Sequence, residues 1–138
     1  MVKITRRKSR EAAVIVLYQS DLLGKDPEEV LKNEIDFGKK IDEFALELVI
    51  GVNKNRKAID EEIVGVVENW TIERIAIIDR NILRVAIYEM LFEKDIPLKV
   101  SVDEAIEIAK SLGQKDDTPK FINGILGRIL TNIGGKLI

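Results

Sequence analysis

Hydrophobic side chains recur every three or four residues along most of the chain, which is the spacing of amphipathic α-helices. No convincing strand pattern occurs, so the sequence predicts an all-α protein. Apolar residues between Ile75 and Phe92 occupy nearly every face of a helix, and we expect this helix to be central and buried. The other predicted helices cover about 9–23, two or three turns from Pro27, about 39–55, about 56–68, residues 101–113 and a final stretch from Thr118.

Several predicted helices have residues that favour starts and stops. Asp26-Pro27-Glu28-Glu29 combines an N-cap, a proline in the first turn and two acids near the positive end of the helix dipole. Gly24 is suited to end the preceding helix, and Gly134-Gly135 to end the last one. The segment from Ser101 to Glu104 matches a capping box, in which Ser101 would be the N-cap.

The sequence leaves the division of the chain into units open. Halves of about 1–70 and 71–138 could each form a helical subdomain, and a core shared between them is equally compatible with the pattern. The join near 53–55 likewise allows either two helices or one bent helix. With 138 residues and 46% hydrophobic content, the chain has the size of one domain with a sizeable core.

Composition narrows the chemistry further. The sequence has no cysteine and no histidine, which excludes disulfides, thiolate nucleophiles and imidazole metal ligands. Helix capping and solvated faces explain the acidic pairs at 61–62, 103–104 and 116–117 better than acid–base catalysis does, and close helix packing would explain Gly124 and Gly127. No apolar run approaches the roughly 20 residues of a membrane span, and no signal peptide is evident. We therefore expect a cytoplasmic, non-enzymatic protein without a cofactor.

Positive charge is concentrated at the N-terminus. The first ten residues carry five cations and no acid, whereas the other 128 carry 17 Lys and Arg against 24 Asp and Glu. A chain of net charge −2 is thus a +5 arm on a −7 body, which favours a local site for a polyanion over a disordered, solubilising N-terminus. Four or five neutralised phosphates would give a salt slope of roughly −3 for a single strand. The cations of the arm are Lys3, Arg6, Arg7, Lys8 and Arg10.

A second basic feature lies within the central apolar segment. Arg80, Arg84 and Tyr88 are spaced four residues apart and form a narrow polar stripe on the predicted helix. Arginines and an aromatic on one stripe could bind phosphates and stack on unpaired bases. Internal ion pairs with Asp79, Glu89 or acids on other helices are the alternative, and the spacing alone favours these pairs.

Four segments of the sequence also form recognisable motifs. They are RRKSREAAV at 6–14 with Leu17-Tyr18, DRNILRVAIYE at 79–89, PLKVSVDEAIEIAK at 97–110 and KFINGIL at 120–126. In this order they resemble the NusB family of bacterial transcription antitermination factors. With the intervening helices the resemblance covers nearly the whole chain, although residues 24–70 agree only in helical pattern and approximate length.

The resemblance implies a fold of about seven helices in two packed subdomains. It also implies binding to boxA, a short single-stranded RNA element of ribosomal RNA leaders. The implied protein partner is the ribosomal protein NusE, which would bind RNA together with this chain and join the antitermination complex on RNA polymerase. Some members of the family form homodimers, so a homodimer stays open as well.

The resemblance assigns roles to individual residues. The N-terminal segment of the family contacts RNA, and Tyr18 and Asp79 fall in its RNA- and partner-binding region. The loop before the last helix and the first aromatic of that helix belong to the partner surface, with either acid of the loop as the contact. The candidate RNA-binding residues are Lys3, Arg6, Arg7, Lys8, Arg10, Tyr18, Asp79, Arg80 and Arg84, and the candidate partner-binding residues are Asp116, Asp117 and Phe121.

Two other functions fit a helical chain of this kind. Similar helical domains precede RNA methyltransferase domains, but no methyl-donor fingerprint or catalytic cysteine follows here, so this alternative needs a further domain. A helix-bundle adaptor without RNA contact is the other alternative, and the basic arm argues against it.

Overall fold

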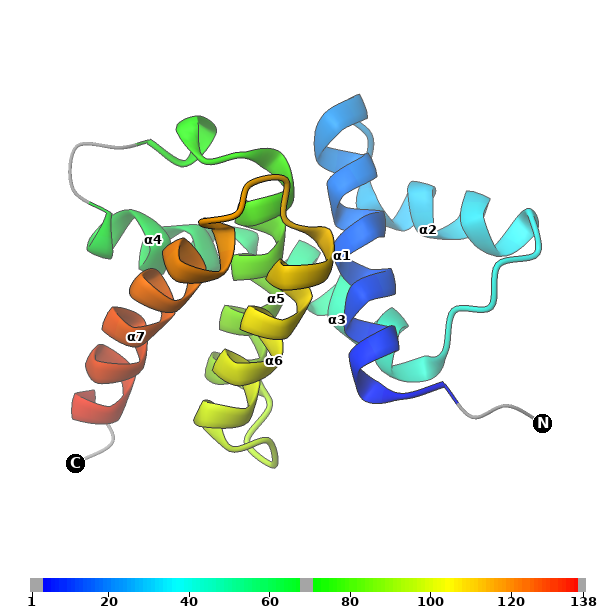
Figure 1. The fold of residues 1–138 in the computed structure, drawn as a ribbon. Coiled ribbons are helices and arrows are strands. Elements are labelled where there is room, and N and C mark those ends of the chain that lie inside the picture. The colour runs from blue at the N-terminus through cyan, green and yellow to red at the C-terminus, as the bar shows by residue number, and fades with distance from the viewer. Residues whose placement is uncertain (1–3, 68–70, 137–138) are drawn as a thin grey trace.

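The chain forms seven α-helices and one 3-10 turn in the part that the structure describes, residues 4–67 and 71–136 (Figure 1). This computed structural model confirms the all-α fold class and the expected number of helices. The elements are α1 (Arg6–Leu23), α2 (Pro27–Asp36), α3 (Glu43–Lys54), α4 (Arg56–Val66), η1 (Ile72–Arg74), α5 (Ile77–Phe92), α6 (Leu98–Leu112) and α7 (Thr118–Lys136).

Helix α5 is the centre of the fold, as its apolar pattern predicts. Every residue from Asn81 to Met90 is buried, and α5 packs against α1, α3, α4, α6 and α7 (Figure 1). One hydrophobic core extends from Ala13 on α1 to Ile133 on α7 and so includes both halves of the chain. The division into two subdomains stays a prediction. None of the described helices is long and apolar enough to cross a membrane.

Several helix ends follow the predicted signals. Gly24 ends α1 with a φ of 66°, a left-handed conformation that glycine adopts without strain. The Asp26 carboxylate accepts the backbone N–H of Glu28 at 2.9 Å, and Pro27 opens α2. Helices α3 and α4 are separate and meet at Asn55, which settles the alternative of one bent helix.

Three local predictions are wrong. Helix α6 begins at Leu98 rather than after Ser101, because the Pro97 carbonyl already accepts the N–H groups of Val100 and Ser101. Ser101 is therefore a buried helical residue and no capping box forms. Helix α7 continues through Gly134 to Lys136. Gly124 and Gly127 have open space where a Cβ would lie, so close helix packing does not explain them.

The closest approach that a glycine permits lies between α3 and α5. A Cβ on Gly51 would lie 2.2 Å from Cζ of Tyr88, so the tyrosine ring occupies the space of the missing side chain. Tyr88 is buried and its ring also lies 5.5 Å from that of Phe92, centroid to centroid. Tyr88 is therefore a packing residue. Its buried ring cannot stack on an unpaired base, which was one possibility for the polar stripe of Arg80, Arg84 and Tyr88.

Candidate nucleic-acid and partner interface

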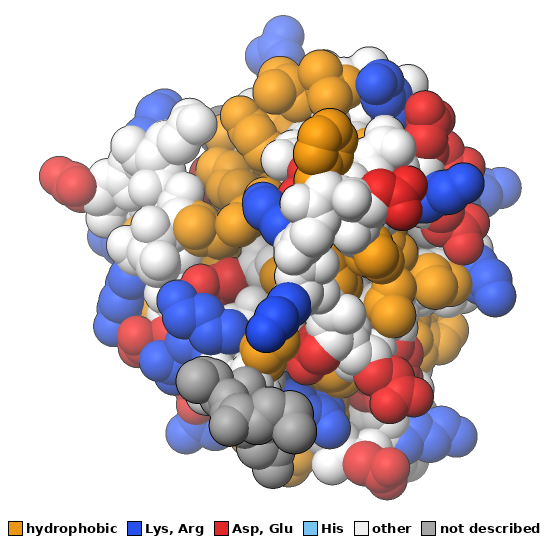
Figure 2. Space-filling model, turned by 90° about the vertical axis from the view of Figure 1, so that its right-hand side faces the viewer, with side chains coloured by type: hydrophobic (Ala, Val, Ile, Leu, Met, Phe, Trp, Pro, Cys, Tyr) orange, Lys and Arg blue, Asp and Glu red, His pale blue; other side chains and the backbone are white. Residues whose placement is uncertain are grey.

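The basic arm starts an ordered helix. Helix α1 begins at Arg6, three residues earlier than its apolar pattern indicates, because Thr5 caps it and accepts the backbone N–H of Lys8 at 3.1 Å. Figure 2 faces the side on which α1 begins and α2 ends, and lysine and arginine side chains stand in the middle of this face. Lys3 lies outside the described residues. The other four cations of the arm have very different surroundings.

Arg10 points into the protein. Its Nε and Nη2 donate to the two carboxylate oxygens of Glu89, each at 2.8 Å, and these side chains are only 6% and 1% exposed. The Ser101 hydroxyl donates to the same Glu89 at 3.1 Å. This buried cluster joins α1, α5 and α6. The paired guanidinium of Arg10 thus helps to hold α1 in place, and its contact with RNA stays a prediction.

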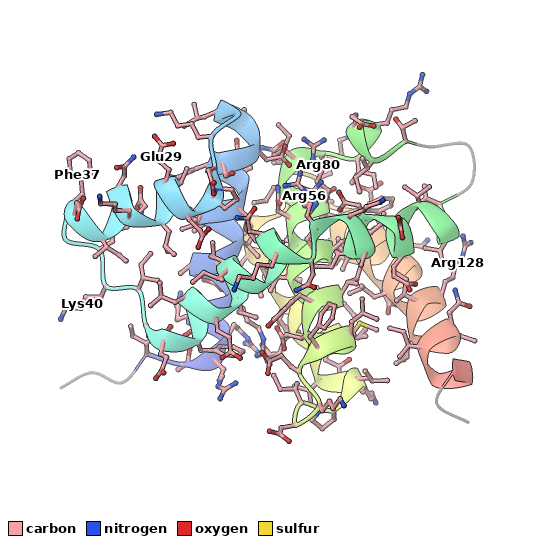
Figure 3. All side chains as sticks on the ribbon, turned by 180° about the vertical axis from the view of Figure 1, so that it is seen from behind. Glu29, Phe37, Lys40, Arg56, Arg80 and Arg128 are labelled. Carbon is pink, nitrogen blue, oxygen red and sulfur yellow. The ribbon has the colours of Figure 1, made fainter. Side chains whose placement is uncertain are left out.

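Arg80 and Arg84 are also engaged internally, which confirms the alternative of ion pairs. Arg84 is 2% exposed and bridges Asp21 on α1 and Asp60 on α4, each at 2.9 Å. Arg80 donates to both carboxylate oxygens of Asp21, at 2.6 and 2.7 Å. The acids lie on other helices, and neither Asp79 nor Glu89 is the partner. Asp60 pairs with Arg56 as well as with Arg84. Arg56 and Arg80 are labelled next to each other in Figure 3.

This network sets the charge state of its acid. Burial alone would raise the pKa of Asp21, but hydrogen bonds from Arg80, Asn81 and Arg84 outweigh burial and hold the pKa well below its usual range. Asp21 therefore stays ionised between two arginines. The network joins α1 and α4 to α5. Arg80 and Arg84 therefore stabilise the packing of the helices beneath the candidate site and are not part of its exposed surface.

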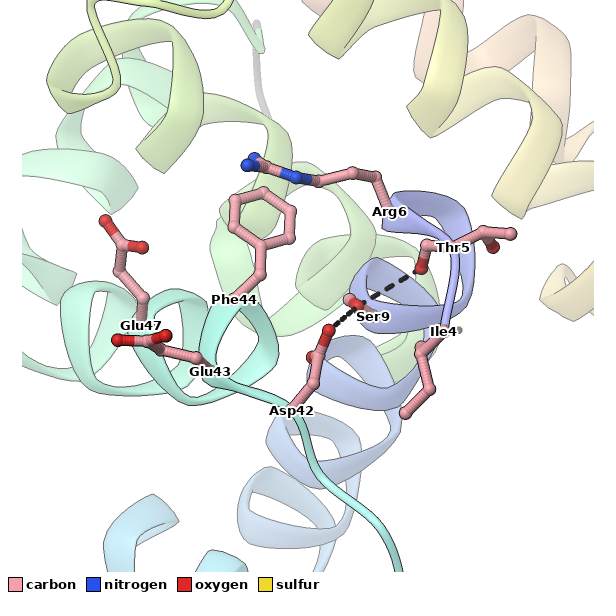
Figure 4. A pocket seen from close by; sticks show the side chains of 8 residues that line it. All are labelled: Ile4, Thr5, Arg6, Ser9, Asp42, Glu43, Phe44 and Glu47. Carbon is pink, nitrogen blue, oxygen red and sulfur yellow. Dashed lines mark hydrogen bonds between the residues drawn. The ribbon is translucent and has the colours of Figure 1, made fainter. Parts of the chain in front are cut away.

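Arg6 is the cation best placed to meet a phosphate. Its guanidinium carbon lies 3.9 Å from the centre of the Phe44 ring, in a cation–π contact, and no described residue accepts a hydrogen bond from it. Figure 4 shows this guanidinium over Phe44 at the edge of an open pocket of about 730 Å³. Stacking fixes the group while its N–H donors stay available. Phe44 is itself a buried residue of the core, and sequence reasoning gave it no role at the site.

Arg7 and Lys8 are exposed and carry looser partners. Arg7 makes a two-pronged contact to Glu104 on α6, with Nε 2.7 Å from Oε2, and this hydrogen bond lowers the pKa of Glu104. Lys8 lies 3.4 Å from Glu11. Both pairs face solvent, so a phosphate can compete for them at low cost. Eleven residues after Arg7, Tyr18 lies on the same face of α1, half-buried and about 16 Å further along.

A second region brings a candidate RNA-binding residue, Asp79, beside two of the candidate partner-binding residues. Asp79, Asp117 and Phe121 line a pocket of about 240 Å³ between the start of α5 and the loop before α7. Asp117 is among its lining residues and Asp116 is not, although both are exposed. Phe121 is half-buried against the core. The pocket thus joins two segments that are 35 residues or more apart in the sequence.

Asp79 has a buried acceptor that the described residues leave unused. Its Oδ1 receives no hydrogen bond from them. Burial raises the pKa of Asp79, an effect that nearby Lys115 opposes and nearby Asp117 reinforces. A buried polar atom without a partner costs free energy, so this oxygen favours a ligand that brings a donor.

Comparisons with known proteins identify the family of the chain. The sequence matches the NusB family over residues 7–131. It is 46% identical over 125 residues to the transcription antitermination protein NusB of Bacillus cereus (strain B4264), an alignment that covers 90% of this chain and 95% of that protein. The Bacillus thuringiensis (strain Al Hakam) protein of the same name is 45% identical with the same coverage.

Solved structures show the same fold. T. maritima NusB superimposes with a TM-score of 0.83 at 41% identity, covering 94% of this chain and 93% of that one. A crystal structure of antitermination factors NusB and NusE in complex with dsRNA gives a TM-score of 0.80 at 27% identity, covering 92% and 96%. This chain therefore belongs to the NusB family, whose members are transcription antitermination factors and not enzymes.

Proposed function

We propose that this chain binds RNA at the start of α1, binds a NusE-type ribosomal protein at the pocket of Asp79, Asp117 and Phe121, and acts with both in transcription antitermination. The observation that carries the proposal is Arg6, whose guanidinium is fixed on Phe44 with its donors free. Lys8 and Arg7 extend positive charge along the same turn. The structural relative in complex with NusE and dsRNA supports both partners.

The RNA that we expect is the boxA element of ribosomal RNA leaders, read as a single strand. Arg6 and Lys8 supply phosphate contacts, and Tyr18 adds an aromatic surface on the helix face that carries Arg7. Since the body of the chain is acidic, RNA is repelled elsewhere and the contact stays local. Joining the antitermination complex on RNA polymerase then follows from the pairing with a NusE-type protein.

Equilibrium binding tests this function. Affinity for boxA RNA, a scrambled strand and a boxA duplex is measured with and without NusE, and NusE affinity is measured with and without RNA. We expect boxA and NusE to tighten each other's binding by the same factor, about 5- to 150-fold. Equal affinities with and without the other ligand would contradict a joint surface. A mass measurement on the free protein checks for a homodimer, which would cover these surfaces if α1 lies in its interface.

The partner pocket has a test of its own. Because truncating a buried aromatic at the centre of an interface can cost over 2 kcal/mol, Phe121→Asp should weaken NusE binding at least tenfold. Val64→Asp is the matched control, since it places the same charge at an exposed hydrophobic position on α4 outside the pocket lining, and it should bind NusE normally. Circular dichroism melting separates the two roles of Phe121: an unfolded variant would make it a core residue and remove it from the interface.

A further inference from the structure

The turn that ends α2 presents an aromatic side chain to solvent. Phe37 is 89% exposed, the largest value among the exposed large hydrophobic residues, and Ile35 beside it is 44% exposed. Figure 3 shows Phe37 directed away from the body of the protein, at the edge where Lys40 also lies. The resemblance to known motifs assigns nothing to this turn, since residues 24–70 matched only in helical pattern.

The backbone of the turn is fixed. Gly38 has a φ of +91°, and its N–H donates to the Ile35 carbonyl at 2.9 Å. The Lys39 N–H donates to the Glu34 carbonyl at 3.1 Å, which completes a Schellman motif. This motif commonly packs a hydrophobic side chain after the glycine onto the helix, but here Lys39 and Glu34 form an ion pair at 2.9 Å instead. The Phe37 backbone N–H donates to the Asn33 carbonyl at 3.0 Å, but its side chain stays in solvent and takes no part in this contact.

The turn continues the basic surface of α1. Lys40 and Lys8 line one shallow pocket of about 440 Å³, together with Ile4 at the start of the arm. Among the described residues, Lys40 has no carboxylate within ion-pair distance. The nearest acid of this pocket, Asp42, accepts from the Ser9 hydroxyl at 2.6 Å and from the Ala45 N–H at 3.0 Å, so it is already engaged. Figure 2 shows basic side chains beside hydrophobic ones on this face.

We propose that the turn from Phe37 to Lys40 is a second contact for single-stranded RNA, with an unpaired base stacked on the Phe37 ring and phosphates on Lys39 and Lys40. An aromatic platform beside cations is the combination that binds single strands without reading their sequence. Lys39 and Lys40 follow the ring in the sequence, and the acids that precede it are Glu34, which is paired with Lys39, and Asp36. A single projecting ring without an apolar groove around it favours a stacked base over a protein segment. This inference rests on the proposed RNA binding at α1 and extends its path across the molecule.

The test uses RNA length and two kinds of variant. Fluorescence anisotropy of the full chain is measured with the boxA strand alone and with boxA extended by several nucleotides at either end. Phe37→Ala should weaken the extended strand at least fivefold and the short strand little, while Phe37→Trp restores the affinity. Lys39→Gln with Lys40→Gln should flatten the salt slope by about 1.4, because each lost phosphate contact removes roughly 0.7. Phe37→Ala should leave that slope unchanged.

Controls separate the alternatives. Val64→Ala removes an exposed apolar side chain on α4 and should change neither affinity nor slope. Wild-type affinity for both strands in Phe37→Ala, with RNA binding still sensitive to Arg6→Ala, would overturn this inference alone. Loss of NusE binding in Phe37→Ala without RNA would make the turn a protein contact and also overturn it. Absence of RNA binding by the wild-type protein would instead overturn the proposed function and this inference with it.

Discussion

Arg6 and Arg10 lie one helical turn apart and do opposite work. Arg6 is exposed, stacked on Phe44 and free to donate, whereas Arg10 is buried in a two-pronged pair with Glu89. Both guanidinium groups lie near the Phe44 ring, at 3.9 and 5.4 Å from its centre. Counting charges in the arm therefore overstates the number of cations that are free to meet a phosphate. Whether an arginine of the arm can bind a phosphate depends on whether an acid from another helix already forms an ion pair with it.

The largest effect is expected where the buried network is broken. Arg84→Ala removes one of the largest fully buried side chains and leaves a cavity where it stood, while Asp21 and Asp60 lose their shared cation and keep only one arginine each. The variant should lower the free energy of unfolding by about 3–5 kcal/mol. Arg56→Ala is the matched control, since Arg56 pairs with the same Asp60 at the surface and should cost about 1 kcal/mol or less. Urea unfolding measures both. Similar losses in the two variants would contradict the contrast between buried and exposed pairs.

Arg10→Ala should cost nearly as much, about 3 kcal/mol, because it strands the Glu89 carboxylate in the core. Replacing both partners, as in Arg10→Met with Glu89→Leu, should be milder than the single change. A stable Arg10→Ala variant with weak RNA binding would instead place Arg10 at the RNA. For the same reason, changing Arg6, Arg7 and Arg10 together would mix unfolding with lost contacts.

Arg6→Ala tests the other side of the comparison. Loss of an exposed cation–π contact should change stability by about 1 kcal/mol or less. RNA affinity should fall, and the slope of log K against log salt should become less steep by about 0.7. Arg128→Ala on α7 removes an exposed arginine far from the arm in sequence, and its slope should match the wild type. An unchanged slope in Arg6→Ala would exclude a phosphate contact.

The smallest effect concerns pH. A hydrogen bond with Glu47, aided by burial, raises the pKa of Glu93 to about 7. The folded protein thus holds this proton more tightly than the unfolded chain, so the contribution to stability is complete below about pH 4.5 and is lost as the pH rises through 7. The lowered pKa of Asp21 acts in the opposite direction, with stability lost only as the medium becomes strongly acidic.

Unfolding in urea between pH 5 and 8 checks this sign. Wild-type stability should fall relative to Glu93→Gln as the pH rises, by about 1 kcal/mol or less because solvent screens the pair. A difference between the two proteins that does not vary with pH would show that Glu93 does not hold the proton.

Local patterns predicted the helices better than the contacts. The central position of α5 followed from apolar residues on all its faces, and the start of α2 from Asp26-Pro27. The start of α1 was placed too late because the arm has few apolar residues, and Thr5 caps it instead. The partners of the arginines were out of reach for a different reason. Arg10 and Glu89 are 79 positions apart, and only the packing of α1 on α5 brings them together.

The contact of Gly51 with Tyr88 also predicts how the chain tolerates change. Alanine at position 51 would overlap the phenol ring, which the surrounding core holds in place, so this position is closed to every side chain. Gly124 and Gly127 face open space within α7, where alanine has a higher helix propensity by about 1 kcal/mol. A library of variants should therefore lose position 51 entirely and enrich alanine at the other two. The three glycines look alike in the sequence. Gly51 allows α3 and α5 to approach each other closely, whereas Gly124 and Gly127 lower helix stability without permitting any close contact.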